Sequence, residues 1–207
     1  MKHTDLLMIA ALLSIHPAFA APASVECLTG AQIAEQLPPY VQSQFQDMAS
    51  PRFDDAMSAF IAISAGLRLG HQIPTQAAKP YFHSEIASNG QPRSNLLTIK
   101  QTLTALGIRE IKGYQLLEKD SALARIMDHD QSLRFVIEQQ AMLIGVADHA
   151  GMGIMFTAYD ITPQQSKVLF ANQTLCRMPS WYLFELSRKQ AGFLLIPAHN
   201  SQATQYF

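Results

Sequence analysis

The chain has 207 residues, with 15 Lys and Arg against 16 Asp and Glu, which gives a formal net charge of −1. Hydrophobic residues make up 48% of the chain and charged residues 15%, a balance that suits a globular protein with a sizeable core. Because the near-neutral charge leaves no basic surface to attract phosphate backbones, we expect no nucleic-acid partner.

The first twenty residues have the features of a secretory signal peptide. A basic start, "KH", precedes the apolar run of residues 6–13, and the small-residue site "AFA" ends at Ala20. The apolar run is short for a bilayer span, and the A-x-A site predicts cleavage after Ala20. We therefore expect a periplasmic or secreted protein with one domain over residues 21–207 and no membrane span once the signal is removed.

The first part of the mature chain is predicted to be helical. Apolar residues at helical spacing run from residue 27 to residue 37. Proline lacks the backbone amide and clashes with the preceding turn, so Pro38-Pro39 should end this short amphipathic helix.

A longer helix is predicted to start at Ser50-Pro51. The Ser50 hydroxyl can cap the helix, and Pro51 suits its first position. Asp54 and Asp55 fall in the opening turns, where the helix dipole favours negative charge. Apolar residues continue at spacings of three and four, and Gly70 is the expected C-terminal cap. We expect this helix to lie at the centre of the core.

The middle of the chain is predicted to be a long loop followed by short elements. Residues 71–93 contain three prolines and the pair "NG", which favours an ordered loop with at most a short helical turn. A helix is expected from Ser94 to its glycine cap at Gly107. A short strand over 108–114 and a short helix over 121–127 follow.

The second part of the chain is predicted to be rich in strands. Short runs of Val, Ile, Phe and Met are separated by polar or glycine turns, which is typical of an antiparallel sheet. The expected strands cover residues 133–137, 141–146, 152–159, 167–171 and 192–196, with a helix from Ser180 before the last of them. The predicted fold class is α+β, with the helical first half packed on an antiparallel sheet from the second half.

This order of elements resembles the papain-like cysteine peptidases of the C39-like type. The matching stretches are residues 94–108 ("SNLLTIKQTLTALGI"), 141–159 ("AMLIGVADHAGMGIMFTAY"), 168–172 ("VLFAN") and 180–196. The resemblance implies a papain-like fold whose chemistry needs a thiolate at the start of the buried helix, a histidine base on the sheet and a residue that orients the imidazole.

Carried over to this chain, the resemblance implies His149 as the base and Asn172 as the orienting residue, with Asp160 as the alternative. Asp54 or Asp55 stands where the family has its thiol. This departure points to a degenerate member that binds a peptide or protein partner, with Asp55 as half of a weaker acid site beside His149.

The chain contains two cysteines, Cys27 and Cys176. Exported proteins usually oxidise such a pair, so we expect a disulfide that ties the mature N-terminus to the region after a core strand. The alternative is an active thiol peptidase or hydrolase that uses Cys27 with His149 and Asn172.

Other chemistry has weaker support in the sequence. The triplet Asp128-His129-Asp130 and the pair Asp148-His149 offer metal ligands, but the chain has neither an H-x-x-x-H pair on a helix nor a cysteine cluster. The serine-hydrolase motif G-x-S-x-G does not occur. We therefore expect no metal and no cofactor, and without a thiol partner we interpret His149 as a structural residue at a strand end.

Overall fold

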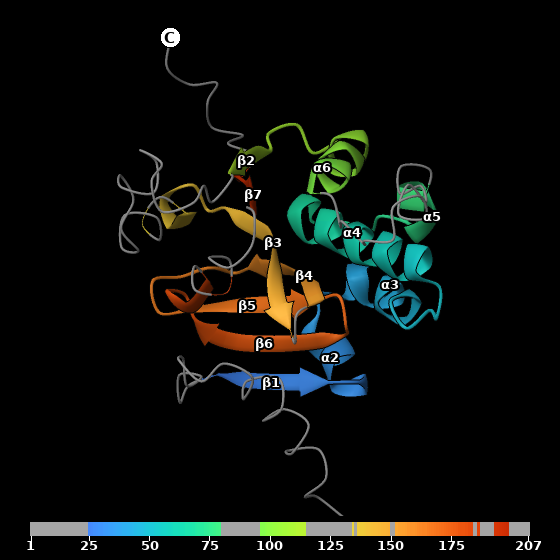
Figure 1. The fold of residues 1–207 in the computed structure, drawn as a ribbon, viewed down its shortest axis with the longest axis horizontal. Coiled ribbons are helices and arrows are strands. Elements are labelled where there is room, and N and C mark those ends of the chain that lie inside the picture. The colour runs from blue at the N-terminus through green and yellow to red at the C-terminus, as the bar shows by residue number, and fades with distance from the viewer. Residues whose placement is uncertain are drawn as a thin grey trace, which may run out of the picture.

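The structure is a computed structural model that describes residues 25–79, 96–114, 134, 136–149, 152–183, 186 and 193–198 (Figure 1). Several predictions fall outside these residues. They are the signal peptide, the Ser94 cap, the helix over 121–127 and the Asp128-His129-Asp130 triplet.

The core of the fold is a seven-stranded sheet with the strand order β1-β6-β5-β4-β3-β7-β2. Its strands are β1 (Glu26–Thr29), β2 (Lys112–Tyr114), β3 (Met142–His149), β4 (Met152–Tyr159), β5 (Gln165–Phe170), β6 (Thr174–Pro179) and β7 (Phe193–Ile196). Every neighbouring pair is antiparallel, and β3 to β6 form a continuous meander. The predicted α+β class is confirmed.

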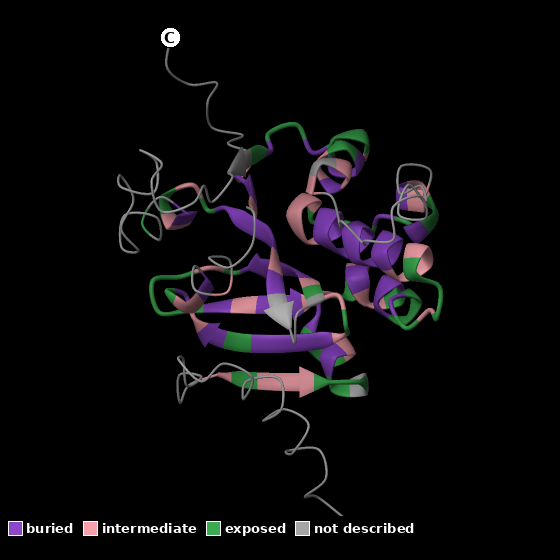
Figure 2. Ribbon diagram, in the orientation of Figure 1, coloured by how far each residue is buried: buried purple, intermediate pink, exposed green. Residues whose placement is uncertain are grey.

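The helices that precede β2 gather on one side of the sheet (Figure 1). They are α2 (Ala31–Gln36), the 3-10 helix η1 (Pro39–Val41), α3 (Gln42–Asp47), α4 (Phe53–Leu69), α5 (Thr75–Ala78) and α6 (Leu96–Ala105). Helix α4 is buried over most of its length, from Met57 to Gly66 (Figure 2). It ends at Gly70 in the left-handed conformation, with φ of 75°, which confirms the predicted central helix and its glycine cap.

Side-chain alternation along the sheet separates two apolar clusters. In β3, Met142 and Ile144 pack in the cluster that contains the residues of α4, whereas Leu143 and Ala147 pack in the second cluster. Leu183, after the end of β6, joins the second cluster. The sheet therefore has a thick helical layer on one face and a thin layer on the other.

Two contacts fix the C-terminal half of α4 over β3 and β4. The hydroxyl groups of Ser64 and Thr157 lie 2.6 Å apart, and both residues are fully buried. One turn later Arg68 donates a hydrogen bond of 3.4 Å to the carbonyl oxygen of Gln140, which precedes β3. Because buried hydroxyl groups need partners, the Ser64–Thr157 pair constrains how α4 sits on the sheet.

The structure corrects the prediction of a helix from residue 27 to residue 37. Residues 26–29 form the edge strand β1, which pairs with β6, and only Ala31–Gln36 is helical. Gly30, with φ of 67°, turns the chain between the two elements. The strand pairing and the disulfide to β6 override the local helical pattern.

Two further expectations differ from the structure. Residues 136–138 are helical, and the amide of Ala141 bonds to the carbonyl oxygen of Val136 at 2.9 Å, so the strand predicted over 133–137 is wrong. Strand β6 (Thr174–Pro179) was not predicted, because its proline and its mixed polar pattern favour a loop.

Candidate functional site

The start of α4, where the resemblance expects a thiol, is a charge cluster centred on Asp55. The Asp55 carboxylate accepts an ion pair from Lys79 at 2.8 Å and lies 3.8 Å from the Arg52 guanidinium. The Ser50 hydroxyl also donates to Asp55, at 3.5 Å. The hydrogen bond from Lys79 holds the pKa of Asp55 below its usual value, against the opposing effect of burial.

This cluster predicts an acid-dependent loss of stability. The pKa of Asp55 is lower in the folded state than in the unfolded state. Its ion pairs therefore stabilise the protein fully at a pH above the unfolded-state pKa of about 3.9. This stabilisation is lost as the pH falls through the folded-state pKa. We expect Asp55→Asn to lower the urea midpoint at pH 6, and to lower it by less as the pH falls below the unfolded-state value. Asp54→Asn in the same turn is the control, and an equal pH effect of both variants would contradict the prediction.

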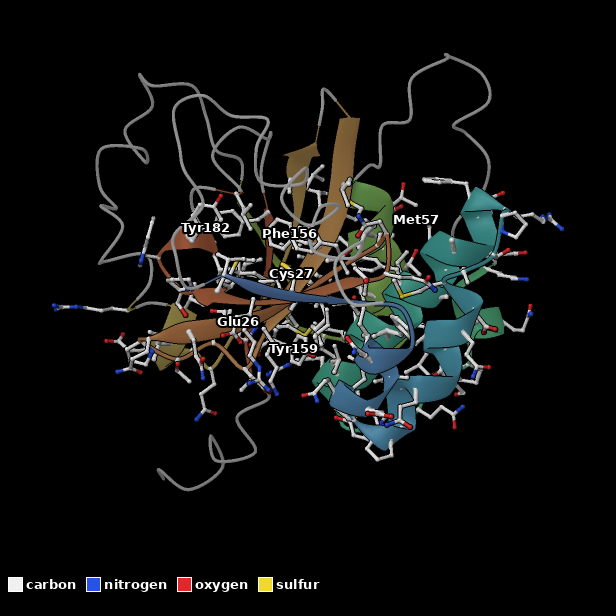
Figure 3. All side chains as sticks on the ribbon, turned by 90° about the horizontal axis from the view of Figure 1, so that it is seen from below. Glu26, Cys27, Met57, Phe156, Tyr159 and Tyr182 are labelled. Carbon is white, nitrogen blue, oxygen red and sulfur yellow. A yellow bond between two sulfur atoms is a disulfide. The ribbon has the colours of Figure 1, made fainter. Side chains whose placement is uncertain are left out.

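The predicted disulfide is confirmed: Cys27 in β1 and Cys176 in β6 are bonded through their sulfur atoms. Because the chain has two cysteines, the bridge leaves no free thiol. Cys27 lies on the sheet, apart from Met57 in the first half of α4 (Figure 3). The start of the buried helix therefore contains no cysteine, and Cys27 and Cys176 lie on other elements of the fold.

Strand register separates Cys27 from His149. Cys27 shares a row of the sheet with Cys176, Val168, Ala158 and Leu143, and β1 is four strands away from β3. Strands are about 4.8 Å apart, so this row places Cys27 roughly 19 Å from β3, and His149 is a further ~20 Å along that strand. The structure does not bring Cys27 and His149 together.

His149 is the last residue of β3 and pairs with Met152, but its side chain lies outside the described part of the chain. Asn172 is exposed in the turn between β5 and β6, at the same end of the sheet, and two strand spacings of about 4.8 Å separate its strand from β3. Asp160 follows the far end of β4, roughly 26 Å along that strand from Met152, which is too far to orient the His149 imidazole.

A site that the sequence did not indicate lies at the other end of α4. A hollow of about 330 Å³ opens between the end of α4 and the strand ends near β3 and β4. Its walls include Leu67, Arg68, Gln140, Tyr159, Asp160 and Ile161. A basic residue in the last turn of a helix is ordinary, so nothing in the local pattern distinguishes Arg68 from a surface residue.

One polar group among the residues that line this hollow, the hydroxyl of Tyr159, stands out because it is buried and unpaired. Tyr159 is 6% exposed, and its buried hydroxyl group has no hydrogen-bond partner in the part of the chain that the structure describes. Burial raises the pKa of the Tyr159 hydroxyl far above its usual range. Desolvation also lowers the pKa of the Arg68 guanidinium, which remains charged at neutral pH.

The described residues contain neither a metal-binding cluster nor a membrane-spanning helix. No group of three His, Cys, Asp or Glu side chains among them is placed to hold a metal ion. In the same part of the chain, no helix has the length and apolar character needed to cross a membrane.

No protein-family profile, curated protein or solved structure significantly matches this chain.

Proposed function

We propose that the protein is exported and binds a peptide or protein partner on a papain-like scaffold that lacks thiol catalysis. The observation that carries the proposal is the Cys27–Cys176 disulfide, which uses both thiols of the chain on strands away from α4. A thiol peptidase requires a thiolate beside a base, and the position that the resemblance assigns to the thiol is Asp54 or Asp55.

The papain-like part of the proposal is supported by the arrangement of layers. A long buried helix, α4, packs on an antiparallel sheet drawn mostly from the second half of the chain. His149 and Asn172 lie at one end of that sheet, on the strand and turn that the resemblance assigns to the base and its orienting residue.

Export is supported by the bridge and by the N-terminal sequence. Structural disulfides persist in oxidising compartments such as the periplasm and the extracellular space. The basic start, apolar run and A-x-A site of the first twenty residues are the signal that would direct the chain there.

The test is a thiol count combined with activity and binding assays on the purified mature protein. Intact mass after alkylation, with and without reductant, should show labelling of Cys27 and Cys176 only after reduction. The oxidised protein should retain members of a randomised peptide pool without cleaving them, and His149→Ala should retain the same members.

Two results would overturn the proposal. One is fast labelling of Cys27 at mildly acidic pH without reductant, together with peptide cleavage that His149→Ala abolishes, which would establish the alternative thiol hydrolase. The other is an oxidised, folded protein that retains no peptide from the pool.

A further inference from the structure

The hollow at the C-terminal end of α4 has a positive charge that the described residues do not neutralise. Arg68 has five N–H donors, and among the described residues it bonds to the Gln140 carbonyl oxygen. No carboxylate of a described residue forms an ion pair with Arg68. Asp160 also lines the hollow, but Lys167 pairs with it at 2.7 Å and offsets its charge.

Tyr159 also lines the hollow, and its hydroxyl is a buried donor. It is more than nine-tenths buried, and its hydroxyl has no acceptor among the described residues. In Figure 3 Tyr159 lies on the opposite side of the sheet from Phe156. This agrees with their packing, since Tyr159 belongs to the cluster that contains the residues of α4 and Phe156 belongs to the second cluster. A buried hydroxyl without a partner is costly, and an acceptor supplied by a ligand would remove that cost.

The remaining walls and the size of the hollow limit what can enter. Leu67, Met142 and Ile161 supply apolar surface beside the charged group. The volume of about 330 Å³ is near the lower end of the range of roughly 300–1,000 Å³ for ligand sites. The hollow therefore suits the end of a chain with one apolar side chain better than an extended segment.

We infer that this hollow binds a carboxylate attached to an apolar group, as found at the free C-terminus of a peptide that ends in an apolar residue. The guanidinium of Arg68 would donate two parallel hydrogen bonds to the carboxylate, the geometry in which arginine binds carboxylates best. The inference rests on the proposed peptide-binding function. It places recognition at the end of α4 opposite to the one that the resemblance assigns to catalysis.

The experiment compares two fluorescent peptide pools on the full mature protein in its oxidised form. Both pools are pentapeptides with four randomised positions and a C-terminal leucine, one with a free carboxylate and one amidated. The free-acid pool is expected to bind at least about tenfold more tightly, because the amide removes the charge that Arg68 recognises. N-acetyl-leucine serves as a competitor that carries the same carboxylate and side chain without a peptide.

Three variants locate the interaction. Arg68→Gln should abolish the preference for the free acid. Tyr159→Phe should weaken free-acid binding while leaving thermal stability unchanged or raised, since no described residue bonds to the lost hydroxyl. Arg177→Gln is the matched control, because Arg177 is exposed on β6, bonds to Gln36 at 3.4 Å and does not line the hollow. Thermal unfolding of each variant verifies that it is folded.

The outcomes separate this inference from the proposed function. If both pools bind equally and Arg68→Gln changes neither, the inference is overturned while peptide binding stands. If N-acetyl-leucine binds in an Arg68-dependent way and neither pool binds, the hollow is a site for small carboxylic acids, and the proposed peptide function fails. If none of the three probes binds the folded protein, both fail.

Discussion

Replacing both cysteines, as Cys27→Ser with Cys176→Ser, is expected to lower the free energy of unfolding by about 2–5 kcal/mol. The bridge joins residues 149 positions apart, and cross-linking so long a loop removes much of the entropy of the unfolded chain. It also holds β1, an edge strand of four residues that pairs with β6 alone. Four residues with a single neighbouring strand have few other contacts to keep them in register.

Urea unfolding of the oxidised wild type and the double variant, followed by circular dichroism, measures this effect. A second double variant, with alanine at both positions, separates loss of the bridge from the cost of burying the serine hydroxyl at Cys176, which is 3% exposed. Equal unfolding midpoints for the wild type with and without reductant would show that the bridge contributes no stability, contrary to the prediction.

Local patterns were sufficient where an element is determined by its own sequence. Helix α4 combines a three-four apolar spacing, two acidic residues in its first turn and a glycine at its end, and these features predict it correctly. Its start is the exception: the helix begins at Phe53 with Arg52 as an N-cap that has no side-chain bond, so the predicted Ser50 cap with Pro51 at the first position is wrong. Strand β4 was predicted with the bounds Met152–Tyr159, because β-branched and aromatic residues lie between glycine and the bend at Asp160.

Non-local pairing explains the errors. Residues 27–29 belong to the apolar pattern over residues 27–37 that predicts a helix, and their pairing with β6 makes them part of a strand. Strand β6 itself carries little signal without its neighbours β1 and β5. The apolar residues within 136–138 are compatible with either a strand or a helical turn, because so short a run shows no period. In the folded protein these residues form a helical turn, with Val136 buried in the second cluster.

The same limit applies to the candidate sites. The resemblance could nominate His149 and Asn172 from their places in the order of elements, and the sheet brings their strands to one end. The hollow, in contrast, combines a helix end with the starts and ends of strands, so Arg68 and Tyr159 meet only in three dimensions. A missing hydrogen-bond partner, the feature that marks Tyr159, is invisible in a sequence.

The second cluster predicts the other large effect, at Phe156. This side chain is fully buried in β4, and its ring lies 6.0 Å from the ring of Phe170. Replacing it with alanine should lower the free energy of unfolding by about 3–5 kcal/mol, because the transfer term and the remaining cavity both act. Urea unfolding measures the loss, and Phe156→Leu should cost less because it fills more of the space.

A glycine opposite Phe156 makes this prediction specific to the packing of the ring. Gly145 pairs with Phe156 across the strands, and a Cβ atom there would come within 2.8 Å of the phenylalanine ring. Gly145→Ala should therefore destabilise the wild type by about 1–3 kcal/mol through overpacking, and should cost little when Phe156 is already alanine. Additive losses in the double variant would mean that the ring does not lie over Gly145, and the proposed origin of the Phe156 effect would be wrong.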